Sequence, residues 1–334
     1  MKFARLIWSA TPSLALAALL APTSAWACAS CGCTLSSDWQ NPTEPGFRLD
    51  VRYDYVSQSQ LRSGTNTISP QAASTLSNSG NQQEVEKYTV NNYYTVALGY
   101  TFSSEWRADV QLPFVARRHS TLGTASDGVT AGAGGGQYDS DFSALGDVKV
   151  IGSYQGFSPQ HNFGIQLGLK LPTGKFNLTG TSTDAATPGP VAVDRALQPG
   201  SGTTDLIFGF YFVDALNKNW DYYTNDFYQS ALNSRDAYRP GDGLNLNVGL
   251  RYMGLSHVMP ELQANARYVQ IDSGANADTI STGGSLVYLS PGAVVPVSDL
   301  AAVYAFLQVP IFQNFQGVQL APTYTASVGA RYKF

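Results

Sequence analysis

Apolar and polar residues alternate along most of the chain after residue 46, with a period of two instead of the 3.6 of a helix. The first such segment has Phe47, Leu49, Val51, Tyr53 and Tyr55 at alternate positions, and four charged residues between them. In a strand these two sets point to opposite faces. If the apolar face meets a lipid bilayer, a one-residue slip costs about 2–4 kcal/mol for each Arg moved to the bilayer midplane. The register is therefore strongly determined.

Similar alternating segments recur to the end of the chain. Twelve strands are predicted, at 47–55, 88–102, 106–117, 143–157, 162–173, 203–213, 219–231, 242–254, 257–271, 283–297, 300–312 and 323–334. Short turns are predicted at 103–105, 158–161, 214–218, 254–257 and 298–299. Long polar loops are predicted at 56–86, 118–142, 174–202, 232–241, 272–282 and 313–322.

This asymmetry between short turns and long loops is typical of outer-membrane proteins. The pattern predicts an all-β fold, a transmembrane antiparallel up-and-down β-barrel of about 12 strands at 46–334. The long loops would be extracellular, and the short turns and both termini periplasmic. The protein would then lie in the outer membrane of a Gram-negative bacterium, in contact with outer-membrane lipid.

Aromatic residues cluster at one end of the predicted strands. The residues beside the short turns and the chain end are Phe102, Trp106, Phe157, Phe163, Phe212, Trp220, Tyr252 and Phe334. Rings at these positions would form a girdle at the membrane interface. The closing residues Tyr332 and Phe334 resemble the C-terminal signal read by the barrel-assembly machinery, which is therefore an expected partner.

The N-terminus predicts export. Lys2 and Arg5 precede the apolar run 14–20, and residues 25–27 form a small-x-small cleavage site. A signal peptide is therefore predicted at 1–27, and a periplasmic segment that contains the cysteines at 28–45. Lipidation at Cys28 is an open alternative.

Composition narrows the class of protein. Charged residues make up 13% of the chain and aromatic residues 12%, and the formal net charge is −4. Without a basic surface, nucleic acid is not an expected partner. The one candidate for a spanning helix after the predicted signal peptide, 293–312, contains Pro296, Asp299 and Pro310 and predicts a hairpin, not a membrane helix.

The polar face of the strands is the candidate working surface. The candidate lumen-lining residues are Arg48, Asp50, Arg52, Asp54, Lys87, Arg107, Asp109, Lys149, Lys170, Arg251, Arg267 and Arg331. Asp147, Asp205 and Glu261 share this face. These charges could line a narrow polar path that selects permeants. They could equally neutralise each other and fill a small barrel with ion pairs.

Cys28, Cys31 and Cys33 form the most compact local motif. Three thiolates this close could bind Cu(I) or supply ligands to Zn²⁺. The alternative in an oxidising envelope is one disulfide and one remaining thiol. No other cofactor is expected.

Catalytic signatures are sparse. His119 and Ser120 are adjacent, and adjacent residues point to opposite faces of a strand, whereas a catalytic triad needs converging side chains. We therefore expect no enzymatic activity.

Several segments together resemble a known family. They are 168–174, 197–205, 288–292, 306–310, 314–320 and 328–334. The chain resembles the outer-membrane transporter family named for meta-pathway phenol degradation, over most of the barrel. This resemblance implies a channel or transporter for small molecules, with aromatic or poorly soluble compounds as candidates. The alternative is a closed binding or structural barrel that carries a periplasmic thiol or metal site.

Overall fold

The computed structural model describes residues 43–77, 85–121, 138–183 and 188–334. The predicted signal peptide and the three cysteines lie outside these residues, so what was inferred for them stays a prediction. The elements are β1 (Gly46–Gly64), β2 (Asn66–Thr67), α1 (Pro70–Ser77), β3 (Glu86–Thr101), β4 (Trp106–Thr121), β5 (Tyr138–Leu145), β6 (Val148–Tyr154), β7 (Phe163–Leu171), β8 (Thr179–Ser182), β9 (Gly189–Ala192), η1 (Arg195–Leu197), β10 (Asp205–Asn217), β11 (Trp220–Ala231), β12 (Gly243–Tyr252), β13 (Met259–Val269), β14 (Gly284–Pro296) and β15 (Ala301–Lys333). No helix in the described ranges is both long and apolar enough to cross a membrane.

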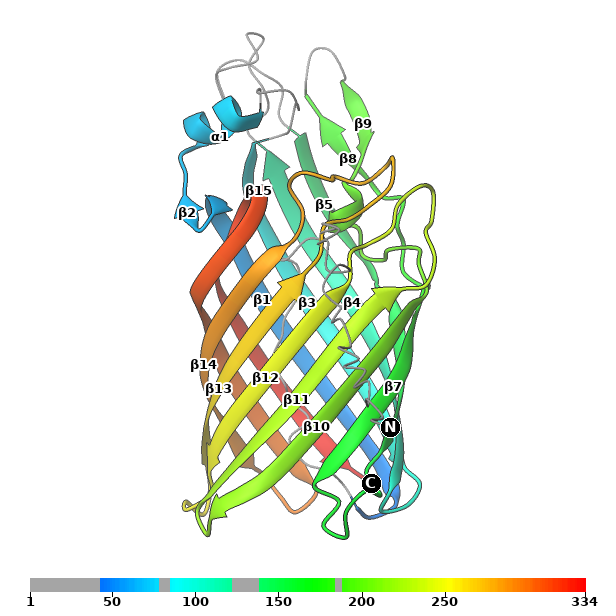
Figure 1. Cartoon of the computed structure of the whole chain (residues 1–334), viewed down its shortest axis with the longest axis vertical. Helices are drawn as coiled ribbons and strands as arrows, with labels where there is room; N and C mark the ends of the chain where they lie inside the picture. Colours follow the sequence, from blue (N-terminus) through cyan, green and yellow to red (C-terminus); the bar gives the residue numbers. More distant parts are fainter. Residues whose placement is uncertain (1–42, 78–84, 122–137, 184–187) are drawn as a thin grey trace, which may run out of the picture.

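The strands form a closed antiparallel barrel, as Figure 1 shows. Among the described residues, eleven strands complete the ring: β1, β3, β4, β6, β7, β10, β11, β12, β13, β14 and β15. Pairing of β15 with β1 closes the wall. Closure leaves no strand edge in the wall, which a membrane-spanning sheet requires.

The last strand, β15, runs through the barrel wall twice, once in each direction. Its residues 302–315 pair with β14, and its residues 315–333 pair with β1. The backbone N–H of Lys333 donates to the carbonyl of Leu300 at 2.8 Å, so the two ends of β15 lie together. The reversal lies near Gly317, whose φ of 60° is readily adopted by glycine. The described wall is thus crossed twelve times, in agreement with the predicted number.

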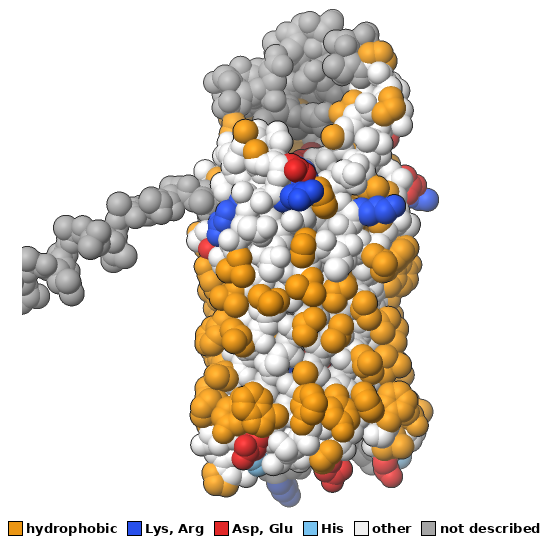
Figure 2. Space-filling model, turned by 90° about the vertical axis from the view of Figure 1, so that its right-hand side faces the viewer, with side chains coloured by type: hydrophobic (Ala, Val, Ile, Leu, Met, Phe, Trp, Pro, Cys, Tyr) orange, Lys and Arg blue, Asp and Glu red, His pale blue; other side chains and the backbone are white. Residues whose placement is uncertain are grey.

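Side-chain orientation in the wall follows the predicted alternation. In β1, Phe47 and Val51 are about half exposed at 50% and 45%, whereas Asp50 and Asp54 are buried at 9% and 1%. Figure 2 shows hydrophobic side chains covering the middle of the outer wall, with charged side chains near its ends. So large an apolar surface is suited to lipid. The fold and its face assignment place the barrel in a bacterial outer membrane.

Aromatic rings meet at the short-turn end of the barrel. The ring of Tyr154 lies 4.6 Å from that of Trp106 and 4.9 Å from that of Phe157. The rings of Trp220 and Tyr252 lie 4.8 Å apart on neighbouring strands. Such a band of rings suits the interface, where an apolar ring body and a polar edge are both satisfied.

Several predicted loop boundaries were wrong. The expected loop at 313–322 is part of β15, and the expected loop at 56–86 begins only after β1 ends at Gly64. The predicted strand 143–157 is replaced by β5 and β6, which pair with successive parts of β4 and are separated at residues 146–147. Strand pairing continues beyond the apolar band because backbone hydrogen bonds need no lipid-facing side chain. The loss of apolar alternation therefore does not mark the end of the strand.

The topology predicts which tags reach the cell surface. An epitope inserted at Pro188, beside β9 at the loop end of the barrel, should bind antibody on intact cells. The matched insertion at Ser298, in the short turn before β15, should bind antibody only after the outer membrane is permeabilised. Surface labelling at Ser298 in intact cells would contradict the predicted periplasmic position of this turn.

Candidate functional site

A segment after β9 folds into the barrel. We call residues 193–204 the inward loop; it contains η1, whose first turn is capped by the Asp194 side chain. The loop separates two cavities. The outer cavity, of about 470 Å³, includes Asp194 and Leu197 in its lining, and the inner cavity, of about 490 Å³, includes Arg195, Gln198 and Ser201. Reduced solvation inside the mouth and the neighbouring Asp278 raise the pKa of Asp194, whose side chain stays accessible to the outer cavity.

Polar anchors hold the inward loop in place. The Arg195 guanidinium donates to the carbonyls of Phe176 at 3.2 Å and Ser201 at 2.9 Å, and lies over the Tyr238 ring at 4.8 Å. The Gln198 amide donates to the carbonyl of Leu178 at 3.0 Å and accepts from its N–H at 3.0 Å. These bonds satisfy polar groups that would otherwise be buried without partners, so they define one position for the loop.

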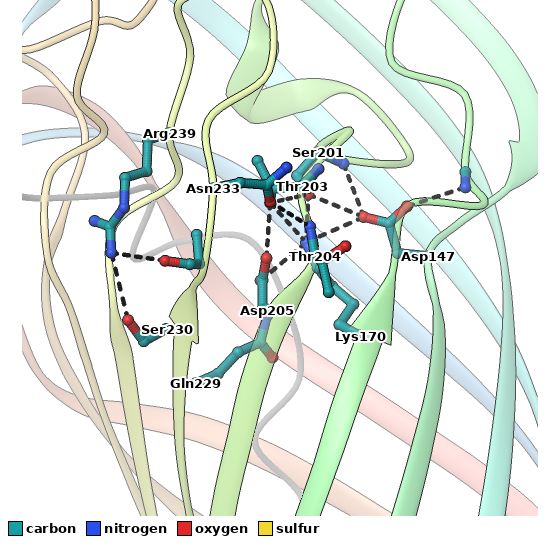
Figure 3. A network of polar contacts seen from close by, with 12 residues as sticks. Asp147, Lys170, Ser201, Thr203, Thr204, Asp205, Gln229, Ser230, Asn233 and Arg239 are labelled. Atoms are coloured by element: carbon teal, nitrogen blue, oxygen red, sulfur yellow. Dashed lines mark hydrogen bonds and ion pairs between the residues drawn. The ribbon is translucent and has the colours of Figure 1, made fainter.

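An ion-pair network joins the loop to the wall, as Figure 3 shows. The Lys170 ammonium lies 3.1 Å from Asp147 Oδ2 and 2.9 Å from Asp205 Oδ2. Asp147 also accepts from the backbone N–H of Ser201 at 2.9 Å and from that of Gly174 at 3.0 Å. All three charged side chains are less than a tenth exposed. Because a buried charge is costly without its partner, the network is sensitive to loss of any one member.

Two glycines allow this close approach. A Cβ atom at Gly174 would lie 2.7 Å from the backbone carbon of Gly146. One at Gly200 would lie 2.7 Å from Asp147 Oδ1 and 2.7 Å from the backbone carbon of Gly174. The glycine-rich segments 168–174 and 197–205, noted in the sequence, therefore pack the inward loop against the start of β6.

The structure separates the predicted lumen residues into three groups. Those that line the inner cavity are Arg48, Asp50, Arg52, Asp54, Asp109, Lys149, Lys170, Arg267 and Arg331. Arg107 and Arg251 are buried side chains that contact Asp109 and Asp221 respectively. Lys87 does not point inward: it is exposed at a register shift between β3 and β4, because the extra residue of a bulge breaks the alternation.

Most charges that line the inner cavity are paired. Arg48 lies 3.0 Å from Asp109, Arg52 lies 2.8 Å from Asp54, and Arg331 lies 3.2 Å from Asp50. Arg52 and Asp54 are successive inward positions of β1, and Arg331 and Asp50 lie on the neighbouring strands β15 and β1. The pair of Arg48 and Asp109 joins β1 to β4 across β3. The barrel interior thus combines both sequence-based expectations, ion pairs that fill part of the lumen and a cavity that they surround.

Aromatic side chains fill the lumen near the short-turn end. Tyr223, Val294, Tyr304 and Phe306 form a buried cluster, which we call the floor. The Tyr304 hydroxyl donates to Asp50 at 2.9 Å, and the Tyr223 hydroxyl donates to Glu261. The Tyr304 ring occupies the space that a Cβ atom at Gly329 would need, so the ring packs against the backbone of the second half of β15. The sequence analysis did not predict the floor. Gln308 lies on the same face of β15 as Tyr304 and Phe306, so alternation from this buried polar residue would have assigned both rings to the lumen.

Arg195 and the inward loop were also missed, since residues 174–202 were expected to form an extracellular loop. The clue available in the sequence was Leu197, an apolar residue in a polar segment. It is buried beside Val193 and Tyr138. Elsewhere, His119 shares a 2.8 Å hydrogen bond with Thr89. No group of three or more His, Cys, Asp or Glu that could hold a metal occurs in the described ranges.

Comparison with solved structures identifies this architecture. An outer-membrane channel from Pseudomonas putida F1 superimposes with a TM-score of 0.61 at 12% sequence identity, over 90% of this chain and 99% of that chain. The chain has the fold of an outer-membrane channel. The toluene transporter TbuX from Ralstonia pickettii aligns with a TM-score of 0.47 at 13% identity, over 88% of this chain and 92% of that one. The CymD monoaromatic hydrocarbon channel aligns with a TM-score of 0.46 at 12% identity, over 87% and 89%. No protein-family model and no curated protein matches the sequence.

Proposed function

We propose that this protein is an outer-membrane channel that passes small molecules, aromatic compounds among them. The inner cavity carries the proposal. It is enclosed by the barrel wall, the inward loop lies on its outer side, and its volume of about 490 Å³ is that of a small-molecule site. The outer cavity lies beyond the inward loop, so two successive cavities lie between the barrel interior and the extracellular mouth.

The lining of the inner cavity suits a permeant with both apolar and polar parts. Val115, Ile151, Ile207 and Phe227 contribute apolar surface, and the charged residues described above contribute polar groups. A permeant could exchange water for contacts with either kind of surface. The fold shared with the Pseudomonas putida channel supports the same reading. Membership of the transporter family named for meta-pathway phenol degradation is part of this proposal.

The floor favours a second candidate function. Because Tyr223, Tyr304 and Phe306 fill the lumen near the periplasmic end, a barrel that binds a small molecule without passing it is the alternative. The floor also predicts that any ion current is small, since these side chains occupy the lumen there. Assembly by the barrel-assembly machinery, and a thiol, copper or zinc site at Cys28, Cys31 and Cys33, stay predictions from the sequence.

Planar-bilayer recording tests the channel directly. The purified full chain, inserted into a lipid bilayer in KCl, should give discrete current steps smaller than those of a 16-stranded general porin measured beside it. The porin is a control for insertion. Phenol influx into liposomes that contain the protein should exceed influx into empty liposomes. Absence of both current and influx, with folded protein in the membrane, would reject the channel in favour of the binding barrel.

A further inference from the structure

Lys149 is the most unusual charge in the inner cavity. It lies on β6 directly opposite Lys170 of β7 on one side and Gln111 of β4 on the other. Lys170 contacts both Asp147 and Asp205, whereas the ammonium of Lys149 has no hydrogen bond or ion pair with any described residue. Like charges directly opposite on paired strands are destabilising. An enclosed ammonium without an acceptor adds a desolvation cost.

Other cations surround Lys149. Lys170, Arg267 and Arg52 are close enough to repel its charge, and Asp205 is the acidic group that attracts it. Arg267 lies on β13 and Arg52 on β1, so the positive charges approach the cavity from separate parts of the wall. Arg267 donates to the Asn245 side chain at 2.9 Å.

The acidic groups of the cavity are already engaged. Asp50, Asp54, Asp109 and Asp147 accept from Arg331, Arg52, Arg48 and Lys170 respectively. Asp205 is shared by Lys170, Thr203 and Gln229. The space around Lys149 therefore keeps an excess of positive charge, which an anion would neutralise.

Apolar residues lie one register step below this charge. Ile151 follows Lys149 on the inward face of β6, Ile207 follows Asp205 on β10, and both pair with Gly168 of β7 between them. The Ile151 side chain covers Gly168, since a Cβ atom there would lie 2.9 Å from Ile151 Cγ1. The Lys149 ammonium above an apolar row matches a ligand with a negatively charged head and an apolar body.

We propose that the inner cavity binds a small aromatic carboxylate, with its carboxylate on Lys149 and its ring over Ile151 and Ile207. This names the substrate class of the channel and rests on the proposed function for the route by which the ligand enters and leaves. Arg52 and Arg267 add long-range attraction, and the inward loop covers the bound ligand.

Benzoate and benzyl alcohol are matched probes, because they share the ring and differ in charge. Calorimetric titration of the detergent-purified full chain should show benzoate binding and at least about ten-fold weaker binding of benzyl alcohol. Lys149→Gln should lower benzoate affinity at least about ten-fold, while Lys149→Arg keeps it. Arg118→Gln is the control with the same charge change, because Arg118 is 71% exposed and outside the inner cavity.

Bilayer recordings distinguish the anion site from the channel activity. In a KCl gradient the wild type should favour Cl⁻, and Lys149→Gln should shift the reversal potential toward zero. Heat modifiability checks that each variant is folded. Equal benzoate affinity in the wild type and Lys149→Gln, or no binding in the wild type, would overturn the anion site even if the protein conducts. Benzoate binding that depends on Lys149, without either current or phenol influx, would instead keep the site and reject transport.

Discussion

Replacing Tyr304 and Phe306 together with Ala should raise the single-channel conductance several-fold. These two rings are 4% and 5% exposed and fill the lumen near its periplasmic end. Each substitution removes a large buried ring at a cost of about 3–5 kcal/mol, and in a barrel lumen the vacated space opens to water. The wall keeps its backbone pairing, so the variant should remain heat-modifiable. Planar-bilayer recording measures the effect.

Leu307→Ala is the matched control, because Leu307 lies on the same strand and is 45% exposed on the lipid face. Its conductance should equal that of the wild type. Phe306→Ala alone should give an intermediate value if the double variant assembles poorly. Unchanged conductance in a folded double variant would mean that the floor does not limit the current.

Asp147→Asn should destabilise the barrel by about 3 kcal/mol and loosen the inward loop. The change removes one of the two carboxylates that Lys170 contacts, and weakens acceptance from the Ser201 and Gly174 backbone N–H groups. Because the loop would sample more positions, current through the open channel should become noisier. Urea unfolding in lipid vesicles, followed by tryptophan fluorescence, measures the stability, and bilayer recording measures the noise.

Asp141→Asn serves as the control for this experiment. Asp141 pairs with Arg118 at 2.9 Å, but both side chains are well exposed, at 66% and 71%. Exposed ion pairs contribute at most about 1 kcal/mol, so its stability should stay within that range of the wild type. If the two Asn variants unfold at the same urea concentration, the network around Lys170 does not stabilise the loop.

The sequence alone was sufficient to predict the wall. Alternation assigned Phe47 and Val51 to the lipid face and Asp50 and Asp54 to the interior, and burial confirms each assignment. This works because the two faces of a spanning strand meet different solvents, so each position reports its environment without reference to distant residues. The same local rule failed where a bulge broke the parity, at Lys87.

The contents of the lumen depended on tertiary structure. Apart from the apolar Leu197, nothing local distinguishes the polar, glycine-rich inward loop from a loop on the cell surface. Its place follows from Asp147, Lys170 and Asp205, which meet only because β6, β7 and β10 are neighbours in the closed ring. The lone charge of Lys149 has the same origin, since strand pairing decides that Lys170 takes the nearby carboxylates. Local alternation therefore determined which side chains face inward, and closure of the barrel determined which of them become partners.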